Sequence, residues 1–128
     1  MAAIQVASAY GLEVYTTVGS EEKRKYLMER FPGLDAAHIG NSRDLSFEKM
    51  IQAGTHGKGV DFVLNCLSDE KLQASIRCLA KNGTFLEIGK FDIMNRTKFD
   101  MRHFAKRINF KAVFFDDWPV DSQEIRVK

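Results

Sequence analysis

The sequence is poor in cysteine and proline. It has two cysteines, Cys66 and Cys78, and its three histidines, His38, His56 and His103, are scattered along the chain. No histidine pairs with a cysteine at a spacing typical of zinc sites, so we expect no metal. Two cysteines in a chain without a secretory leader indicate reduced thiols, as in the cytoplasm.

Long hydrophobic runs and an excess of one charge are also lacking. No apolar stretch approaches the roughly 20 residues of a membrane-spanning helix, so we expect no membrane association. Lysine and arginine number 19 against 17 acidic residues, which gives a formal net charge of +2. This charge is too small to indicate a nucleic-acid partner.

The remaining composition is that of an ordinary globular domain, with 45% hydrophobic and 28% charged residues in 128. Helical and strand-like segments alternate along the chain. This order predicts an α/β fold with a doubly wound parallel sheet, Rossmann-like, over residues 1–118. A polar tail of uncertain structure follows at 119–128. The predicted strands are 12–19, 37–42, 60–67, 84–89 and 110–115, and the predicted helices are 2–10, 20–31, 46–53, 68–83 and, weakly, 99–107. The small apolar residues 2–10 predict the end of a buried helix, Ser20 is expected to cap the helix that follows it, and the nearly all-apolar VDFVLNCL, 60–67, predicts a strand covered on both faces.

In such sheets ligands bind beyond the carboxyl ends of the strands. Small, polar or charged residues follow every predicted strand here, although loops are polar in any protein and the pattern alone is modest support. The strand ends read Val18-Gly19-Ser20, Asn41-Ser42-Arg43, Asn65-Cys66-Leu67, Gly89-Lys90 and Phe115-Asp116-Asp117.

The first strand end indicates the cofactor. An acid at this position in dinucleotide-binding folds bonds the adenosine ribose and favours NAD. Here Gly19 and Ser20 take its place, and Lys23 and Arg24 follow one turn into the helix. A hydroxyl and two cations suit a 2′-phosphate and therefore NADPH. The alternative is that Lys23, Arg24 and Lys25 form a solvated helix face.

One expected feature is missing from the sequence. The glycine-rich turn that holds the pyrophosphate of a dinucleotide belongs between the first strand and the first helix. The first predicted element is already a helix, so we expect the fold to be incomplete, with that strand and its glycine loop absent.

Several segments resemble the enoyl reductase domain of animal-type (type I) fatty acid synthase, a zinc-free member of the medium-chain dehydrogenase/reductase superfamily. The resemblance covers about residues 2–118 and is most specific in FLEIGKFD and KLQASIRCLA. Further matching segments are TTVGSEEKRKYL, NSRDLSFE and GKGVDFVLNCLSDEKLQAS.

The resemblance implies a function and partners. It implies that NADPH gives a hydride to the β-carbon of a trans-2-enoyl thioester held on acyl carrier protein. It also implies that this subdomain works with the rest of a cytoplasmic fatty acid synthase chain, and that the parent is a homodimer. Two alternatives stay open: a truncated, non-catalytic nucleotide-binding fragment, and a stand-alone quinone or enone reductase of the same superfamily.

The resemblance also implies roles for individual residues. Lys90 and Asp116 correspond to the candidate proton donors or orienters, and an ammonium beside the substrate can stabilise an enolate-like oxyanion. A catalytic role for the Cys66 thiol is not expected, and Asp92 is interpreted as a turn or cap residue. Glu87, inside a predicted strand, has no assigned role. The implied cofactor contacts are Ser20, Lys23 and Arg24 at the 2′-phosphate, Ser42 and Arg43 at the adenosine end, and Asn65, Leu67 and Gly89 near the nicotinamide and its ribose.

The family topology places the absent strand between the strands predicted at 12–19 and 60–67. Without it, two apolar strands have unpaired backbone groups, and each buried unpaired group costs about 1–3 kcal/mol. We therefore expect the isolated chain to be unstable or prone to aggregation.

Overall fold

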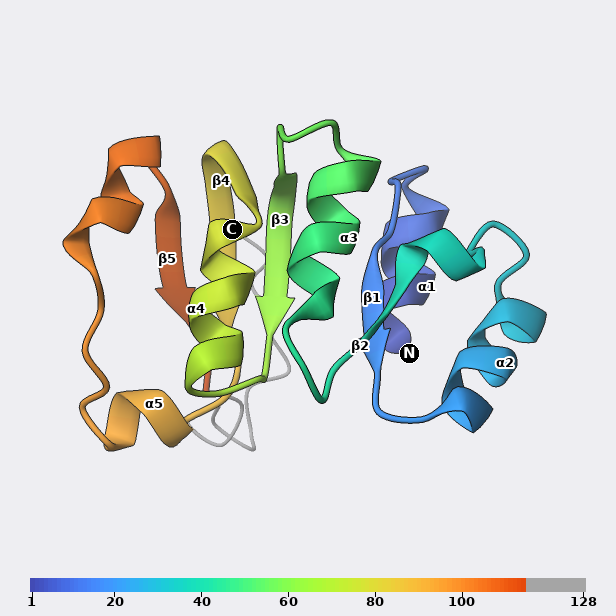
Figure 1. Cartoon of the computed structure of the whole chain (residues 1–128), viewed down its shortest axis with the longest axis horizontal. Coiled ribbons are helices and arrows are strands. Elements are labelled where there is room, and N and C mark those ends of the chain that lie inside the picture. The colour runs from blue at the N-terminus through green and yellow to red at the C-terminus, as the bar shows by residue number, and fades with distance from the viewer. Residues whose placement is uncertain (115–128) are drawn as a thin grey trace, which may run out of the picture.

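The computed structural model describes residues 1–114 and contains five short strands among helices (Figure 1). The elements are α1 (Ala2–Ala9), β1 (Thr16–Val18), α2 (Glu21–Arg30), η1 (a 3₁₀ helix, Ala36–His38), β2 (Ile39–Asn41), α3 (Ser46–Gly54), β3 (Val60–Asn65), α4 (Glu70–Arg77), β4 (Leu79–Glu87), α5 (Phe91–Met94), η2 (a 3₁₀ helix, Met101–Lys106) and β5 (Asn109–Ala112).

All strand pairs are parallel, and the strands form two separate sheets. One sheet has the order β1-β2, with Thr16 opposite Ile39, and the other has the order β3-β4-β5. Helices α3 and α4 lie in front of the strands, and α1 lies behind β1 (Figure 1). The predicted doubly wound α/β class is confirmed. Within residues 1–114 no strand pairs with the free edges of β1 and β3, so the sheet is divided where the absent strand was predicted.

Helix α3 joins the two sheets through a hydrophobic cluster. Phe47 and Ile51 of α3 pack with Ala74 and Cys78 of the α4 region. Tyr15, just before β1, and Val60 of β3 pack against the same cluster. The lack of a side chain at Gly40 permits this approach, because a Cβ there would lie 2.9 Å from Cβ of Phe47. Two further clusters lie one on each sheet: Leu72, Ile76, Leu79, Phe85 and Ile108 with the three-stranded sheet, and Ile4, Leu27, Leu34 and Ile39 with the two-stranded sheet.

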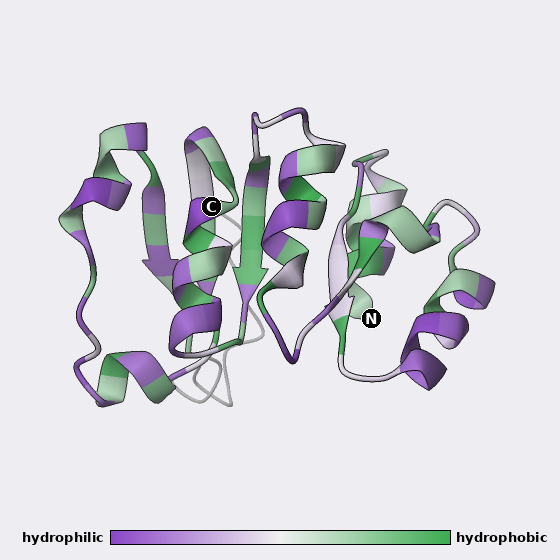
Figure 2. Ribbon diagram, viewed as in Figure 1, coloured by the Kyte–Doolittle hydropathy of each residue, from purple (hydrophilic) through white to green (hydrophobic). Residues whose placement is uncertain are grey.

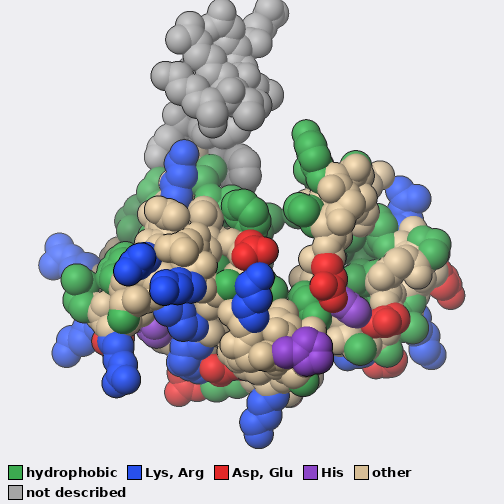
Figure 3. Space-filling model, turned by 90° about the horizontal axis from the view of Figure 1, so that it is seen from above, with side chains coloured by type: hydrophobic (Ala, Val, Ile, Leu, Met, Phe, Trp, Pro, Cys, Tyr) green, Lys and Arg blue, Asp and Glu red, His purple; other side chains and the backbone are tan. Residues whose placement is uncertain are grey.

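The division of the sheet leaves apolar surface exposed. Strand β3 is hydrophobic along most of its length (Figure 2), yet Phe62 is 66% and Leu64 53% exposed. Seen from the end at which the strands begin, the molecule is hollowed between its two halves, with hydrophobic side chains on both sides of the hollow (Figure 3). A strand buried on both faces was expected from the VDFVLNCL run. Val63 packs against a core cluster on one face, whereas no described element covers Phe62 and Leu64 on the other.

Two local predictions were wrong. The first helix was expected to be buried, but among its residues only Ile4 is, and Val6 is 58% exposed. The helix predicted over 68–83 ends at Arg77, because Leu79 already pairs with Val60 and is completely buried. The register between β3 and β4 shifts between Val60 and Phe62 of β3, and Asn82 of β4 has a φ of 65°.

Candidate functional site

The predicted site residues form two groups at the carboxyl ends of the strands. Because β1 and β2 are parallel, the segments after Val18 and Asn41 meet at one edge of their sheet. The segments after Asn65 and Glu87 meet in the same way, since these residues face each other in β3 and β4. The first group contains the residues predicted at the adenosine end, and the second contains those predicted near the nicotinamide.

At the first group, Ser20 is the N-cap of α2. Its hydroxyl oxygen accepts a hydrogen bond from the backbone N–H of Lys23 at 3.3 Å, as the cap position favours. Glu21 and Glu22 occupy the first turn, where acids are favourable. A pocket of about 240 Å³ lies beside this cap, lined by Val18, Gly19, Ser20, Glu21, Arg24, Gly40 and Asn41.

Of the five residues predicted at the adenosine end, Ser20 and Arg24 line this pocket. Ser42 and Arg43 lie against Gly19, which also lines it. A Cβ on Gly19 would lie 3.3 Å from Nε of Arg43 and 3.5 Å from Oγ of Ser42, so the two strand ends are in close contact. Arg24 lines the pocket, although its guanidinium also donates to the carbonyl of Ala36 at 3.2 Å. Lys23 is exposed on the first turn of α2 and does not line the pocket.

The chemistry of these residues suits a phosphate group. Hydroxyl and guanidinium groups at a helix N-terminus can hold a phosphate, and glycine at position 19 lets Ser42 and Arg43 approach this end of the sheet closely. The carboxylate of Glu21, 3.6 Å from Nε of Arg24, competes with an anion for that guanidinium. Residues 1–114 contain no glycine-rich turn that could hold the pyrophosphate.

At the second group, Asn65 and Glu87 tie the strand ends together. Nδ2 of Asn65 donates to Oε2 of Glu87 at 2.8 Å and to the carbonyl of Leu67 at 2.8 Å. Oδ1 of Asn65 accepts from the backbone N–H of Leu67 at 3.2 Å, and Oε1 of Glu87 accepts from that of Gly89 at 2.7 Å. The predicted residues Asn65, Leu67 and Gly89 therefore lie in one hydrogen-bonded network.

The network supplies a reason for Gly89 that involves no ligand. A Cβ at this position would lie 3.1 Å from Oε1 of Glu87 and 3.3 Å from the carbonyl oxygen of Cys66. Both distances are shorter than ordinary van der Waals contact, so a larger residue would push the two loops apart.

Lys90 is half-buried immediately after this network, at the N-cap position of α5. Its Nζ lies 4.9 Å from the centroid of the Phe114 ring, within the range of a cation–π contact. Phe114 follows β5, so the contact places the Lys90 ammonium at the carboxyl ends of β4 and β5. Asp116, the second predicted catalytic residue, lies outside the described residues.

Sequence reasoning left Glu87 without a role, although it is only 3% exposed. Burial raises the pKa of its carboxyl, an effect opposed by the hydrogen bonds from Asn65 and Gly89. An acid inside an apolar strand, with its side chain on the same face as Phe85, was the available signal.

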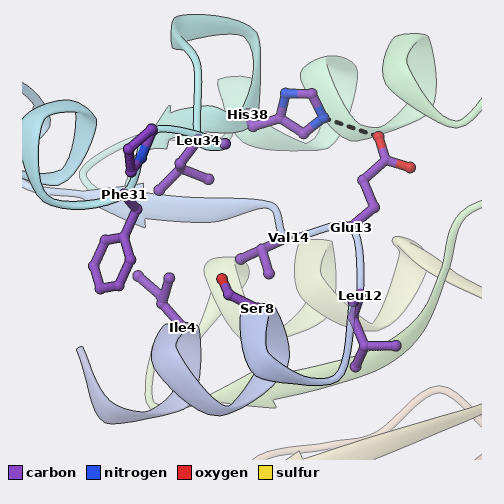
Figure 4. Close-up of a pocket in the computed structure, with 11 residues that line it drawn as sticks. Ile4, Ser8, Leu12, Glu13, Val14, Phe31, Leu34 and His38 are labelled. Carbon is purple, nitrogen blue, oxygen red and sulfur yellow. Dashed lines mark hydrogen bonds and ion pairs between the residues drawn. The ribbon is translucent and has the colours of Figure 1, made fainter.

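A second pocket, of about 340 Å³, lies at the two-stranded sheet and was not predicted (Figure 4). Ile4, Val14, Phe31 and Leu34 are among its apolar lining residues, and His38 and Glu13 also line it. The ring of His38 lies between two carboxylates: Nε2 is 2.9 Å from Oε1 of Glu13, and Nδ1 is 2.6 Å from Oδ1 of Asp35. Hydrogen bonds to Asp35 and Glu13 raise the pKa of His38.

Residues 1–114 contain no cluster of metal-ligating side chains, and one of the two cysteines there is buried. No three His, Cys, Asp or Glu side chains there are grouped so as to hold a metal ion. Cys78 is buried, and burial raises the pKa of its thiol to about 11. No helix in the same range is long and apolar enough to cross a membrane.

The fold is that of a nucleotide-binding α/β subdomain, and comparison with known proteins identifies the family. The family described as zinc-binding dehydrogenase matches residues 1–126, and the chain belongs to it. It is therefore a partial chain of the medium-chain dehydrogenase/reductase superfamily, as predicted. Residues 1–114 offer no grouped metal ligands that fit the zinc of the family's name.

Solved structures give the more particular likeness. The nucleotide-binding subdomain of the enoylreductase domain of PpsC from Mycobacterium tuberculosis matches with a TM-score of 0.80 and 36% identity, over 90% of this chain and 62% of that one. The CurK enoyl reductase matches with a TM-score of 0.71 and 34% identity, over 88% of this chain and 32% of that one.

Similar sequences are found in polyketide synthases. The highly reducing polyketide synthase curS1 of Aspergillus terreus is 49% identical over 125 residues, which is 94% of this chain. The reducing polyketide synthase hmp8 of Hypomyces subiculosus is 52% identical over 112 residues, which is 88% of this chain. The chain spans only 5% of the length of either relative.

Proposed function

We propose that this chain is part of an NADPH-dependent enoyl reductase that acts on trans-2-enoyl thioesters carried by acyl carrier protein. The observation that carries the proposal is the match over 90% of the chain, at 36% identity, to the nucleotide-binding subdomain of an enoylreductase domain. Similar sequences are those of reducing polyketide synthases, so we place the chain in a protein of that kind. The fatty acid synthase implied by the resemblance belongs to the same broader class, the carrier-protein-dependent megasynthases.

In this proposal the two strand-end groups have separate tasks. Bound NADPH supplies the hydride. Ser20, Arg24 and Arg43 bind its 2′-phosphate, with Lys23 reaching the same group from the first turn of α2. The loops that follow β3 and β4 present Asn65, Leu67 and Gly89 to the reacting end.

Lys90 acts on the substrate. Hydride addition to the β-carbon leaves an enolate-like thioester, whose oxygen an ammonium can stabilise. Lys90 then gives a proton to the α-carbon. The contact with Phe114 supports this role, because it holds Nζ at the carboxyl ends of the strands. Asp116 is the second candidate for orienting the ammonium or donating the proton.

Cofactor preference tests the first task. In the full-length protein we expect Lys23→Ala and Arg43→Ala each to raise the Michaelis constant for NADPH about tenfold, the loss of one charge-assisted hydrogen bond, with little change for NADH. Lys25→Ala on the same helix is the matched control. Equal effects on the two cofactors would remove the 2′-phosphate role.

Turnover tests the role of Lys90. We expect Lys90→Ala to lower kcat with an enoyl thioester about 100-fold, the usual contribution of a positioned acid, and to leave the NADPH dissociation constant unchanged. Lys98→Ala, an exposed lysine beyond α5, is the control. Unchanged turnover in Lys90→Ala would exclude it as the donor.

A second candidate, the non-catalytic nucleotide-binding fragment, is favoured by one observation. Residues 1–114 contain neither a strand between β1 and β3 nor a glycine-rich turn. Calorimetric titration of the 128-residue chain with NADPH, beside the full-length protein, distinguishes the two: binding by the full-length protein alone supports the first proposal. Failure of both to bind would contradict both.

A further inference from the structure

Glu87 is a buried acid without a cationic partner in the described residues. Its side chain is 3% exposed, and no lysine or arginine of residues 1–114 forms an ion pair with it. Burial of an uncompensated carboxylate is costly, so its retention at the end of β4 needs a specific set of hydrogen bonds. The donors present are the side chain of Asn65, the last residue of β3, and the backbone N–H of Gly89, in the loop after β4.

Each carboxylate oxygen of Glu87 serves one loop. Oε2 accepts from Nδ2 of Asn65, which also fixes Leu67 in the loop after β3. Oε1 accepts from the backbone N–H of Gly89, in the loop after β4. A glutamine at position 87 has one carbonyl oxygen, so it could accept only one of the bonds from Asn65 and Gly89. Its NH₂ group would then face the other of these two donors. The arrangement therefore requires an acceptor on both oxygens, which is a carboxylate.

A second buried acid repeats this pattern a few residues further on. Asp92 is 7% exposed, and its Oδ1 and Oδ2 accept from the backbone N–H of Asp69 at 3.2 and 3.1 Å. Oδ1 also accepts from the hydroxyl of Thr97 at 2.8 Å. Asp69 is at the end of the loop after β3 and has a φ of 55°, an unusual conformation for a residue other than glycine. Asp92, in the first turn of α5, holds that conformation from the opposite side.

We propose that Glu87 and Asp92 form a carboxylate clamp that positions the loops after β3 and β4 relative to one another, an inference that rests on the proposed function. Glu87 fixes the start of the first loop, at Asn65, and Asp92 fixes its end, at Asp69. The clamp keeps Lys90, which lies between the two acids in the sequence, at a constant distance from the segment that begins at Asn65. Neither acid touches the substrate in this scheme, so both are positioning residues.

The clamp is tested in the full-length protein with Glu87→Gln and Asp92→Asn. Hydrogen-exchange mass spectrometry reports on the loops directly. We expect Glu87→Gln to raise exchange at least tenfold in peptides covering 65–69 as well as 88–92, although the first segment is remote in sequence. Asp92→Asn should act mainly on 68–71 and 92–97. Glu29→Gln, the same change on the exposed surface of α2, is the matched control.

Kinetics separate positioning from general stability. We expect Glu87→Gln to lower kcat at least tenfold while the Michaelis constant for the thioester changes less than threefold, because misplacement of reacting groups affects the transition state most. Asn65→Ala removes the donor of the Asn65–Glu87 hydrogen bond, and it replaces Glu87→Gln in the test if that variant does not fold. The Asn65→Ala/Glu87→Gln double variant should be no slower than the slower single variant.

The outcomes are distinguishable. If the wild-type protein does not reduce enoyl thioesters, the proposed function fails, and hydrogen exchange still decides whether the clamp exists. If the wild-type protein is active and exchange in 65–69 is unchanged in both Glu87→Gln and Asn65→Ala, the clamp is refuted. Faster exchange with unchanged kcat refutes the positioning role.

Discussion

At the scale of single residues, the structure gives hydrogen-bond partners to polar side chains that the sequence left unexplained. Glu87 and Asp92, which the sequence left as an unexplained acid and a turn residue, are both buried. Glu87 accepts a hydrogen bond from Asn65 at the end of β3, and Asp92 accepts from Asp69 in the loop that follows. His38 lies between Asp35 and Glu13 and stacks on Tyr15 at a centroid distance of 4.6 Å.

We predict that His38 makes stability depend on pH. Asp35 and Glu13 raise the pKa of His38 above that of the unfolded chain, about 6.5. The stabilisation is therefore fully present below about pH 6.5 and is lost as the pH rises through the folded value. In urea denaturation at low protein concentration, the midpoint of the wild-type chain should fall between about pH 6 and 8.

His38→Gln is the comparison for this prediction and should show a smaller decrease over the same range. The other partly buried histidine, His103, has its pKa lowered by burial and stays in both proteins, so the difference between them reports on His38. Parallel curves for the two proteins would contradict the prediction.

At the scale of elements, the exposed strand β3 is the feature with the clearest consequence. Its edge facing β1 is unpaired within residues 1–114, and Phe62 and Leu64 are exposed beside it. Unpaired apolar edges recruit other chains. The aggregation expected from the sequence stays a prediction, and β3 is where we place it.

We predict that Phe62→Lys makes the 128-residue chain more soluble. A lysine on an edge strand opposes pairing with a second copy, because each added strand must then bury a charge. Light scattering at increasing concentration should show later onset of aggregation. Met28→Lys, which adds the same charge on the exposed surface of α2, should have a smaller effect; an equal effect would indicate that net charge alone is responsible.

The order and type of most elements were predictable because each has a local signal. Ser20 was expected to cap α2, and its hydroxyl does so. Burial was less predictable, since it depends on neighbours: α1 and β3 have the composition of buried elements, but no described element covers their outer surfaces. Reading the residues at the strand ends was enough to find both groups of the candidate site. Glu87 was missed because the role of an acid in an apolar strand depends on which donors reach it, here Asn65 and Gly89, and the sequence does not show that.

At the scale of the whole molecule, the two sheets depend on α3 for their connection. Phe47 is 3% exposed in the cluster that also contains Ala74 and Cys78, against which Tyr15 and Val60 pack. We predict that Phe47→Ala lowers the free energy of unfolding by about 3–5 kcal/mol, the usual cost of truncating a buried phenylalanine. Urea denaturation measures this loss, and Phe91→Ala, at an exposed position, is the control. A loss below about 1 kcal/mol would show that α3 does not join the halves.

The same contact determines how many thermodynamic units the molecule has. Each half-sheet has its own apolar cluster, so each can melt separately once the coupling between them weakens. With α3 docked, calorimetric and van 't Hoff enthalpies should agree, as they do for a single cooperative transition. We therefore expect cooperative unfolding of this chain to depend on α3. The side-chain contacts of Phe47 and Ile51 connect the two halves, which in an undivided protein a continuous sheet would join.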